Sequence, residues 1–207
     1  MRRYFVLLLV GVSISLSLAG KAIACKGSQV LFEDNFSTLD PGWGHASENL
    51  SVSDGKLIMK PAENAGVSAI NQANIFDDVD ACVTVTMAKS DDPTTSSSGL
   101  VFWVKDFGDY YYLYTMNGAF TVARWVGGRW LYPVSATENA AIKKGVGEAN
   151  NLRVVTNGNE AKIYINDTEL ITFKGQPPQG GGLIGLRSES PTKGTAVWEF
   201  SNLKVTK

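Results

Sequence analysis

The sequence predicts an all-β protein made of antiparallel strands. Short runs rich in Val, Ile, Thr, Tyr and Phe recur along the chain, and almost no stretch after residue 25 has the apolar spacing of a helix. Pairs of Gly, Asn and Asp separate these runs, and such pairs tolerate the positive φ of two-residue hairpin turns. Many short strands at close spacing are typical of a sandwich or a barrel. The turn pairs are Asp54-Gly55, Asn117-Gly118, Gly127-Gly128, Asn157-Gly158 and Asn166-Asp167.

The expected strands follow these turn pairs in order, because each run ends where a turn pair or another Gly, Pro or Asn cluster begins. Around Asn157-Gly158, for example, the register would place Leu152 opposite Ile163. One segment, 136–144, has the composition of a short helix. The expected strands are 29–36, 49–53, 56–60, 66–75, 79–88, 98–105, 109–116, 119–126, 129–134, 150–156, 160–165, 168–173, 182–187 and 196–205.

Length and charge exclude several classes of protein. The 207 residues suit one domain and are enough to bury a sizeable core. Only 19% of the residues are charged and the net charge is -1, which argues against disorder and against nucleic acid as a partner. The one histidine, His45, excludes a multi-histidine metal site and disfavours a histidine-based catalytic triad.

The first 24 residues have the pattern of a signal peptide. Arg2 and Arg3 precede an apolar stretch, 5–18, and Ala22-Ile23-Ala24 matches a small-residue cleavage site. The apolar stretch is shorter than the about 20 residues that a membrane span needs. We therefore expect export to the periplasm or the medium and a single mature domain, 25–207, with no transmembrane segment. That domain would have 16 basic and 20 acidic residues, a net charge of -4.

Both cysteines remain after cleavage, and two roles are open for the first of them. In an oxidising compartment Cys25 and Cys82 could form a disulfide that clips the N-terminal segment to the body. Alternatively, Cys25 could carry a lipid anchor, because the preceding Ala22-Ile23-Ala24 loosely matches a bacterial lipoprotein cleavage site. That site usually has a Leu-like residue where this chain has Ala22, so the disulfide is favoured.

Aromatic residues concentrate between residues 102 and 132, which hold eleven of the nineteen in the mature chain. With two-residue turns at Asn117-Gly118 and Gly127-Gly128, one face of three strands carries most of these rings, in rows across the strands. The opposite face, which includes Leu131, is expected to belong to the core. The residues expected together on the aromatic side are Trp103, Tyr110, Tyr112, Tyr114, Trp125, Trp130 and Tyr132, with Ala123 and Thr121 leaving hollows between them.

Rings that carry a polar group suit a ligand with both apolar and hydroxylated patches, and sugars are such ligands. Arg124, Arg129, Asp106 and Asp109 lie at the edges of this surface and could bind hydroxyl groups. Two other interpretations remain open. The rings could be buried under loops or a second sheet, or they could form a protein contact.

A series of strand and turn phrases resembles a known group of proteins. Their order is similar to that of the concanavalin A-like lectin/glucanase jelly rolls, and within these to the bacterial 3-keto-disaccharide hydrolase domain family. The resemblance covers residues 29–206, and it implies a jelly-roll β-sandwich with a concave face that meets glycans, often in exported proteins. The phrases are Phe32-Glu-Asp-Asn-Phe36, Val52-Ser-Asp-Gly-Lys-Leu57, Gly99-Leu-Val-Phe102, Asp109-Tyr-Tyr-Tyr-Leu113, Gly118-Ala-Phe-Thr-Val-Ala-Arg124, Asn151-Leu-Arg-Val-Val155, Ile163-Tyr-Ile-Asn166, Gly182-Leu-Ile-Gly-Leu186 and Trp198-Glu-Phe-Ser-Asn202.

The resemblance implies catalysis less firmly than it implies the fold. Family-16 laminarinases carry Glu-x-Asp-x-x-Glu on one strand, and this pattern is absent here. The nearest pair, Asp78 and Asp80, is expected to be solvated on the polar face of a scaffold strand. Asp106 and Asp109 are then the remaining candidates for the acids of a hydrolase.

We therefore expect an exported jelly-roll domain that binds a saccharide without cleaving it. A glycoside hydrolase acting on a (3-keto-)disaccharide and a structural or interaction module of the cell envelope are the alternatives. No cofactor is expected. Asp34, Asn35 and Asp40 could supply oxygens to a Ca²⁺ ion, although ordinary turn and capping use is favoured for them.

Overall fold

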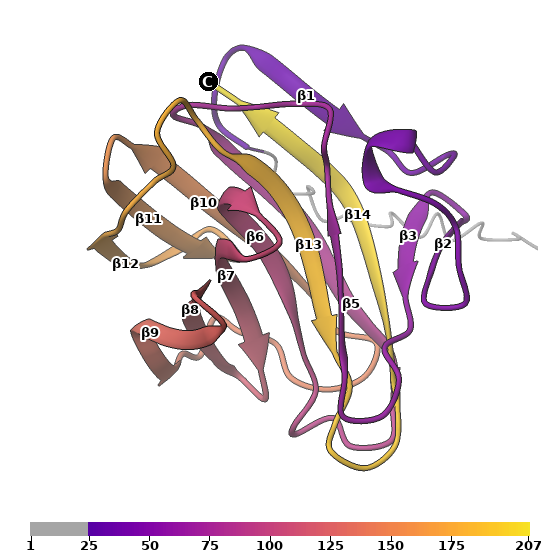
Figure 1. The fold of residues 1–207 in the computed structure, drawn as a ribbon. Helices are drawn as coiled ribbons and strands as arrows, with labels where there is room; N and C mark the ends of the chain where they lie inside the picture. The colour runs from indigo at the N-terminus through magenta and orange to yellow at the C-terminus, as the bar shows by residue number, and fades with distance from the viewer. Residues whose placement is uncertain (1–24) are drawn as a thin grey trace, which may run out of the picture.

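The computed structural model describes residues 25–207, which form two antiparallel sheets packed face to face (Figure 1). The eight-stranded sheet has the order β12-β11-β10-β5-β14-β3-β2, with β1 also paired to β14. The six-stranded sheet has the order β4-β13-β6-β7-β8-β9. The strands are β1 (Val30–Asp34), β2 (Leu50–Ser53), β3 (Lys56–Met59), β4 (Gly66–Ile70), β5 (Asp80–Ser90), β6 (Ser97–Asp106), β7 (Asp109–Met116), β8 (Ala119–Val126), β9 (Arg129–Glu138), β10 (Ala149–Asn157), β11 (Glu160–Ile165), β12 (Thr168–Lys174), β13 (Leu183–Glu189) and β14 (Ala196–Thr206), with one 3₁₀ turn, η1 (Pro41–Trp43).

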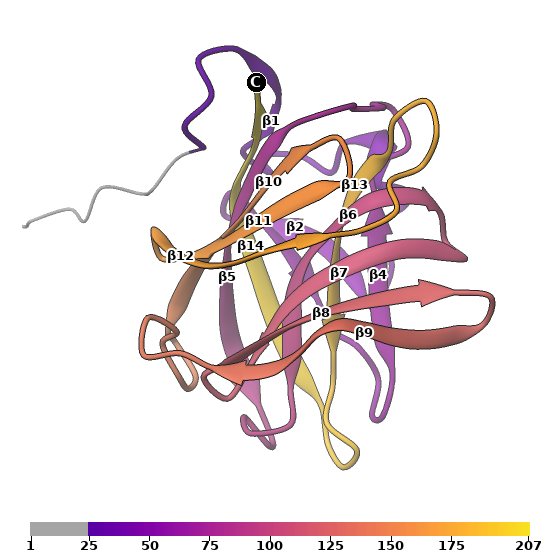
Figure 2. The same cartoon turned by 90° about the vertical axis from the view of Figure 1, so that its left-hand side faces the viewer.

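The prediction of an all-β antiparallel sandwich is confirmed, and each of the expected strands is present. Alternation along the strands explains the architecture, because every second side chain of both sheets points between them. Leu57, Phe102 and Phe200 are among the side chains that this interior buries almost completely. Figure 2 shows β13, β6, β7, β8 and β9 side by side, with the strands of the other sheet beside them.

The N-terminal segment is attached to the outer face of the eight-stranded sheet. Cys25 and Cys82 are joined by a disulfide. This excludes a lipid on the same sulfur, so the structure gives no support to the lipid-anchor alternative. The predicted signal peptide, 1–24, lies outside the described residues. Within residues 25–207, no helix has the length and apolar character that a membrane crossing requires.

The expectation of a short helix at 136–144 is wrong. Strand β9 continues to Glu138, since Thr137 and Glu138 still pair with β8. The chain then turns through Asn139, whose side-chain oxygen accepts a hydrogen bond from the Ala141 amide at 2.9 Å. Ile142 is buried in the core just after this turn. Strand pairing and the anchoring of Ile142 override the helical composition of the segment.

The expectation that Asp78 and Asp80 form a solvated pair is also wrong. Asp80 is buried, and Arg153 Nε and Nη2 donate to its two carboxylate oxygens at 2.6 and 2.7 Å. The Lys26 amide donates to the same carboxylate at 2.7 Å. Asp78 is half-buried and accepts a hydrogen bond from the Gly158 amide at 2.7 Å. The two carboxylates therefore have different structural partners.

Candidate functional site

The outward face of the six-stranded sheet carries the aromatic rows that the sequence predicts. The register places Tyr110 opposite Trp125 and Trp125 opposite Trp130. In the next row, Tyr112 lies opposite Ala123, as expected. The turns at 117–118 and 127–128 have positive φ at each position, which is the backbone that two-residue hairpins require. We call this surface the aromatic face; its rings are Tyr110, Tyr112, Tyr114, Trp125, Trp130 and Tyr132.

The rings of the aromatic face form a buried layer and an accessible layer. Tyr110 and Tyr112 are only 5% and 1% exposed. Tyr114 stacks on Tyr112 with ring centroids 4.8 Å apart, and it is half-buried like the tryptophans of the neighbouring strands. Tyr132 is 56% exposed. The face is thus closed at its base but open at its outer layer, so the interpretation of complete burial fails for the outer rings.

Burial also changes the acidity of these tyrosines. Desolvation raises the pKa of the Tyr112 hydroxyl well above 10.0, and the nearby Glu189 carboxylate adds to the shift. Burial raises the pKa of Tyr110 and Tyr114 as well. The Tyr112 hydroxyl donates to the Arg187 carbonyl at 3.1 Å. The tyrosines therefore remain neutral hydrogen-bonding groups over the physiological pH range.

A hollow of about 240 Å³, open to solvent, lies among the outer rings. The small side chain of Ala123 leaves this space between larger neighbours, as expected from its place in the rows. One carboxylate, that of Glu189, also lines it. The hollow therefore combines aromatic side chains, most of which carry a polar group, with an anionic hydrogen-bond acceptor. Its lining residues are Tyr112, Tyr114, Ala123, Trp130, Tyr132 and Glu189.

Sequence reasoning missed Arg187 and Glu189, which are the charged groups of the aromatic face. They lie two residues apart on β13, so both side chains point to the same side of the sheet. Arg187 Nε and Nη2 donate to Glu189 Oε1 at 3.0 and 2.8 Å. The guanidinium also lies over the rings of Tyr112 and Trp130, 5.9 and 5.5 Å from their centroids. The sequence did carry a signal for them. If the expected strand 182–187 is extended by two residues, its period-two alternation places Arg187 and Glu189 on one face.

Trp103 is not part of the aromatic face, and the expectation that it joins the other rings is wrong. It adopts a left-handed conformation with φ 46°, and the pairing of β6 with β7 is irregular after Phe102. The side chain therefore turns into the core, where it meets the Tyr111 ring edge-on at 5.2 Å. Val104 takes the place on the aromatic side.

Leu131 also differs from its expected place in the core, since it is 39% exposed. Leu131 still lies opposite Arg124, the partner that a turn at Gly127-Gly128 predicts, so it keeps its expected face. It is exposed on β9, which is the edge strand of the six-stranded sheet and has a neighbouring strand on one side only.

Arg124 and the two candidate acids lie at the end of the sheet rather than in the hollow. Arg124 packs over the Tyr111 ring at 5.1 Å, on the core side of the sheet, and donates to Asp109 at 3.2 Å. It also hydrogen-bonds Gln176, which ties a loop to the sheet. Asp106 accepts from the Gly108 amide at 2.6 Å in the β6–β7 hairpin turn. The structure thus brings Arg124 and Asp109 together, but not with the hollow.

The oxygens considered for Ca²⁺ accept hydrogen bonds from nearby groups. Asp34 accepts from the Phe36 amide and the Trp43 indole, both at 2.7 Å. The Asn35 side chain accepts from the Ser37 amide at 3.0 Å. Asp40 accepts from the Gly42 amide at 2.6 Å and precedes η1 as its N-cap. These contacts match turn and capping use. Residues 25–207 contain no group of three or more His, Cys, Asp or Glu side chains arranged to hold a metal ion.

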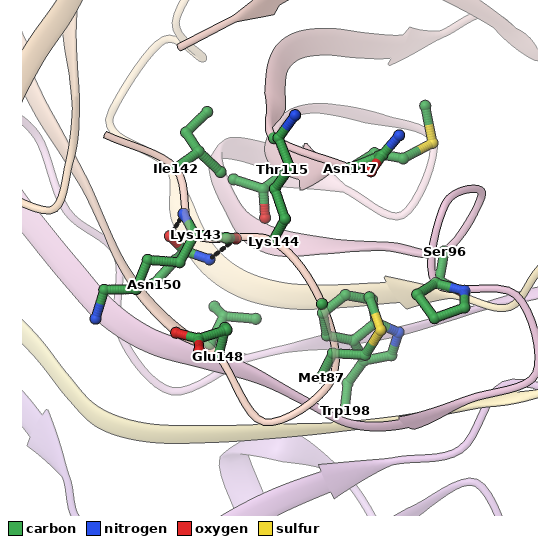
Figure 3. A pocket seen from close by; sticks show the side chains of 15 residues that line it. Met87, Ser96, Thr115, Asn117, Ile142, Lys143, Lys144, Glu148, Asn150 and Trp198 are labelled. Carbon is green, nitrogen blue, oxygen red and sulfur yellow. Dashed lines mark hydrogen bonds between the residues drawn. The ribbon is translucent and has the colours of Figure 1, made fainter. Parts of the chain in front are cut away.

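A second hollow, about 360 Å³ in volume, lies where the β7–β8 turn approaches the segment before β10 (Figure 3). Asn150 crosses it, accepting from the Lys143 amide and donating to the Lys143 carbonyl at 2.9 Å each. Trp198, which also lines it, is only 4% exposed. These contacts close the local structure and leave no exposed ring for stacking. The aromatic face is therefore the stronger candidate for a binding site.

The family model of the 3-keto-alpha-glucoside-1,2-lyase-like domain matches residues 27–206. The chain belongs to this family. Its likeness to the 3-keto-disaccharide hydrolase domain, expected from the order of the strand phrases, is thereby confirmed. Among curated proteins, no sequence matches this member of the family.

Solved structures show the same fold at low sequence identity. The family member is similar to the carbohydrate-binding module CBM66 from Bacillus subtilis, with a TM-score of 0.65 and 15% identity over 80% of this chain and 96% of that one. It is also similar to the Bacillus licheniformis beta-glucanase, with a TM-score of 0.60 and 11% identity over 85% and 97% of the two chains. The laminarinase catalytic domain from Thermotoga maritima MSB8 gives 0.62 and 10% over 86% and 97%. The concanavalin A-like jelly roll is therefore confirmed.

Proposed function

We propose that this protein binds a saccharide on the aromatic face and does not cleave it. The observation that carries the proposal is the hollow, in which aromatic side chains and the Glu189 carboxylate meet. The C–H faces of a sugar ring pack on aromatic rings, and its hydroxyl groups need polar partners nearby. The hollow offers both in one place. The similarity to a carbohydrate-binding module supports the proposal.

The distribution of carboxylates favours binding over hydrolysis. Most glycoside hydrolases use two carboxyl groups about 5 to 9.5 Å apart, on either side of the scissile bond. Glu189 is the one carboxylate among the residues that line the hollow, and Arg187 holds one of its oxygens. Asp109 is paired with Arg124 at the end of the sheet. The usual pair of acids is therefore not assembled in the described hollow.

A second candidate function follows from the family, whose description names a 1,2-lyase of 3-keto-α-glucosides. Such an elimination removes the proton at C2, forms a C1–C2 double bond and expels the glycosidic oxygen with its electron pair, which then takes a proton. Glu189 is the base that the hollow offers for this step, and Arg187 is a cation beside it.

A direct assay with the 3-keto derivative of trehalose distinguishes binding from the catalytic alternatives. Our proposal expects no product release by the wild type. Turnover that falls in Glu189→Gln would favour the lyase, and turnover that falls in Asp106→Asn or Asp109→Asn would favour a hydrolase with those acids. Co-purification with an envelope protein, without any glycan binding, would favour the structural module.

Binding itself is tested by truncating the outer rings. We expect Trp130→Ala and Tyr132→Ala each to weaken glycan binding at least tenfold, about 1.4 kcal/mol, because each removes a stacking surface. Tyr132 is the cleaner position, since its exposed side chain contributes little to the fold. Glycan arrays followed by calorimetric titration measure the effect.

The matched control is Tyr164→Ala, because Tyr164 is a half-buried ring on the outer face of the other sheet. It should bind glycans like the wild type. If no glycan binds the wild type, or if Tyr132→Ala and Tyr164→Ala behave alike, saccharide binding on the aromatic face is wrong.

We also propose that the protein works in an oxidising compartment outside the cytoplasm. The disulfide between Cys25 and Cys82 supports this, because such bonds persist mainly in exported proteins. The signal-like pattern of residues 1–24 supports it as well. N-terminal sequencing of the fractionated protein should find Cys25 as the first residue; an unprocessed cytoplasmic chain would contradict export.

A further inference from the structure

Arg187 and Glu189 form a preorganised pair on the aromatic face. Two N–H groups of Arg187 point to Glu189 Oε1, and Nη1 donates to the Ser68 hydroxyl at 2.8 Å. The Arg187 side chain is 16% exposed, and its guanidinium lies 5.9 and 5.5 Å from the ring centroids of Tyr112 and Trp130. Its orientation is therefore fixed from several sides before any ligand arrives.

A glycine on the neighbouring strand makes room for this arrangement. A Cβ atom at Gly66 would lie 2.3 Å from Arg187 Nη2, so any larger residue would displace the guanidinium. Strand β4 pairs with β13 at this point, with Gly66 opposite Glu189 and Ser68 opposite Arg187. The edge strand thus supplies both a hydrogen-bond acceptor and the space for the arginine.

The pair leaves hydrogen-bonding capacity unused on both partners. A guanidinium has five N–H groups, and three of them are accounted for by Glu189 and Ser68. Glu189 Oε2 accepts one bond, from the Ser97 hydroxyl at 3.2 Å, and can accept more. The Glu189 side chain is 35% exposed and lines the hollow. An acceptor that lines the hollow is therefore bonded to a guanidinium that has two N–H groups outside these three bonds, although Arg187 itself is not one of the lining residues.

The charges of the pair cancel. An added carboxylate or sulfate would meet the exposed Glu189 as well as the less exposed Arg187, so an anionic ligand gains little there. A hydroxyl group both donates and accepts, and two adjacent hydroxyl groups can satisfy both partners at once.

We propose that the Arg187–Glu189 pair determines specificity for a neutral saccharide with two adjacent free hydroxyl groups. One hydroxyl donates to Glu189 Oε2, and its neighbour accepts from a free N–H of Arg187. The sugar ring then packs on Trp130 and Tyr132. This inference rests on the saccharide binding proposed above and adds the polar half of the recognition.

The test combines variants of the protein with deoxy variants of the ligand. A glycan array with neutral, uronic-acid and sulfated members is probed first, and the neutral ligands that bind are compared with their monodeoxy derivatives by calorimetric titration. For the wild type, removing either of the two recognised hydroxyl groups should weaken binding at least tenfold. In Glu189→Gln the parent glycan should bind at least tenfold more weakly, and the penalty for the deoxy derivative should largely vanish. A merely structural role would not remove that discrimination.

Two further variants test whether the loss of binding is specific to the Arg187–Glu189 pair. Gly66→Ala retains both charges but displaces the guanidinium, and it should also weaken binding and reduce discrimination. Glu199→Gln removes a carboxylate that pairs with Lys56 at 2.6 Å on the outer face of the other sheet, and it should bind like the wild type. Thermal unfolding of each variant verifies that it is folded.

The outcomes separate this inference from the proposed function. If Tyr132→Ala loses binding while Glu189→Gln keeps the affinity and discrimination of the wild type, the pair is not the specificity determinant and saccharide binding stands. A wild-type preference for uronic-acid or sulfated glycans also overturns the inference. If no glycan on the array binds, both proposals are wrong.

Discussion

Asp80 shows how far the environment of one residue can depart from its local sequence. It lies in an alternating strand where every second side chain is polar, a pattern typical of a solvated face. Its bidentate partner, Arg153, is 73 residues away in the chain and lies on the adjacent strand β10. The hydrogen bonds that Arg153 donates to Asp80 raise the pKa of Arg153, whose guanidinium also lies 4.6 Å from the centroid of the Tyr164 ring. Such long-range partners carry no local sequence signal.

Removing one member of this pair should destabilise the fold strongly. We expect Asp80→Ala to lower the free energy of unfolding by about 3–5 kcal/mol, because it leaves the Arg153 charge buried without compensation. Urea denaturation measures the change. Replacing both residues, Asp80→Leu with Arg153→Met, should recover much of the loss.

The exposed pair Lys56–Glu199 provides the comparison, since its side chains are 43% and 24% exposed. Lys56→Ala should cost no more than about 1 kcal/mol. Equal effects of Asp80→Ala and Lys56→Ala would show that the Asp80–Arg153 pair is solvated after all.

At the scale of elements, the sequence predicted the hairpins well and the irregular strands poorly. Turn pairs such as Asn117-Gly118 are local signals, so the register of β7 with β8 was correct. At Asn157 the turn begins one residue later than expected, with Leu152 opposite Ile165. This shift moves partners by two positions and therefore keeps every side chain on its expected face. The bulge at Trp103 reversed its face, because a left-handed tryptophan has no sequence signature.

The pairing of β6 with β7 should depend on a glycine. A Cβ atom at Gly99 would lie 1.9 Å from the Leu113 carbonyl oxygen, which is backbone and cannot move aside cheaply. We expect Gly99→Ala to lower the free energy of unfolding by at least about 3 kcal/mol, as overpacking forces the strands apart. Thermal or urea denaturation measures it.

Gly127 is the matched control for this substitution. Gly127 lies in the hairpin turn between β8 and β9 with φ 59°, and no atom lies within 4 Å of an added Cβ atom. Gly127→Ala should therefore cost only the roughly 1–2 kcal/mol of the left-handed backbone. If Gly99→Ala is as mild as Gly127→Ala, the two strands adjust more easily than the close approach implies.

At the scale of the whole molecule, the order of strand phrases was sufficient to predict the sandwich, while the site was predicted only in part. The positions of the aromatic rings follow from local register. Of the seven rings expected on this face, all except Trp103 and Tyr132 pair or pack as the rows require. Arg187 and Glu189 follow the same period-two rule, but β13 lies far from the aromatic segment in sequence. Only the assembled sheet shows that these strands share a face.

The disulfide should stabilise the molecule as a whole. It links residues separated by 57 positions, and the chain-entropy model gives about 4 kcal/mol for a loop of that length. We expect Cys82→Ala, or reduction with dithiothreitol, to lower the free energy of unfolding by that order. The reductant should have no effect on the Cys82→Ala variant. Unchanged stability on reduction would contradict this expectation.

The position of the disulfide also determines how the molecule can be presented to a ligand. Cys82 belongs to the outer face of the eight-stranded sheet, so the N-terminal segment leaves the sandwich on the side away from the aromatic face. A tether coupled at the N-terminus would hold that side against a solid support and turn the hollow toward the solution. Reduction would loosen the tether without touching the hollow. Immobilisation through the N-terminus thus leaves the hollow accessible from solution, which is the arrangement that a test of the proposed saccharide binding needs.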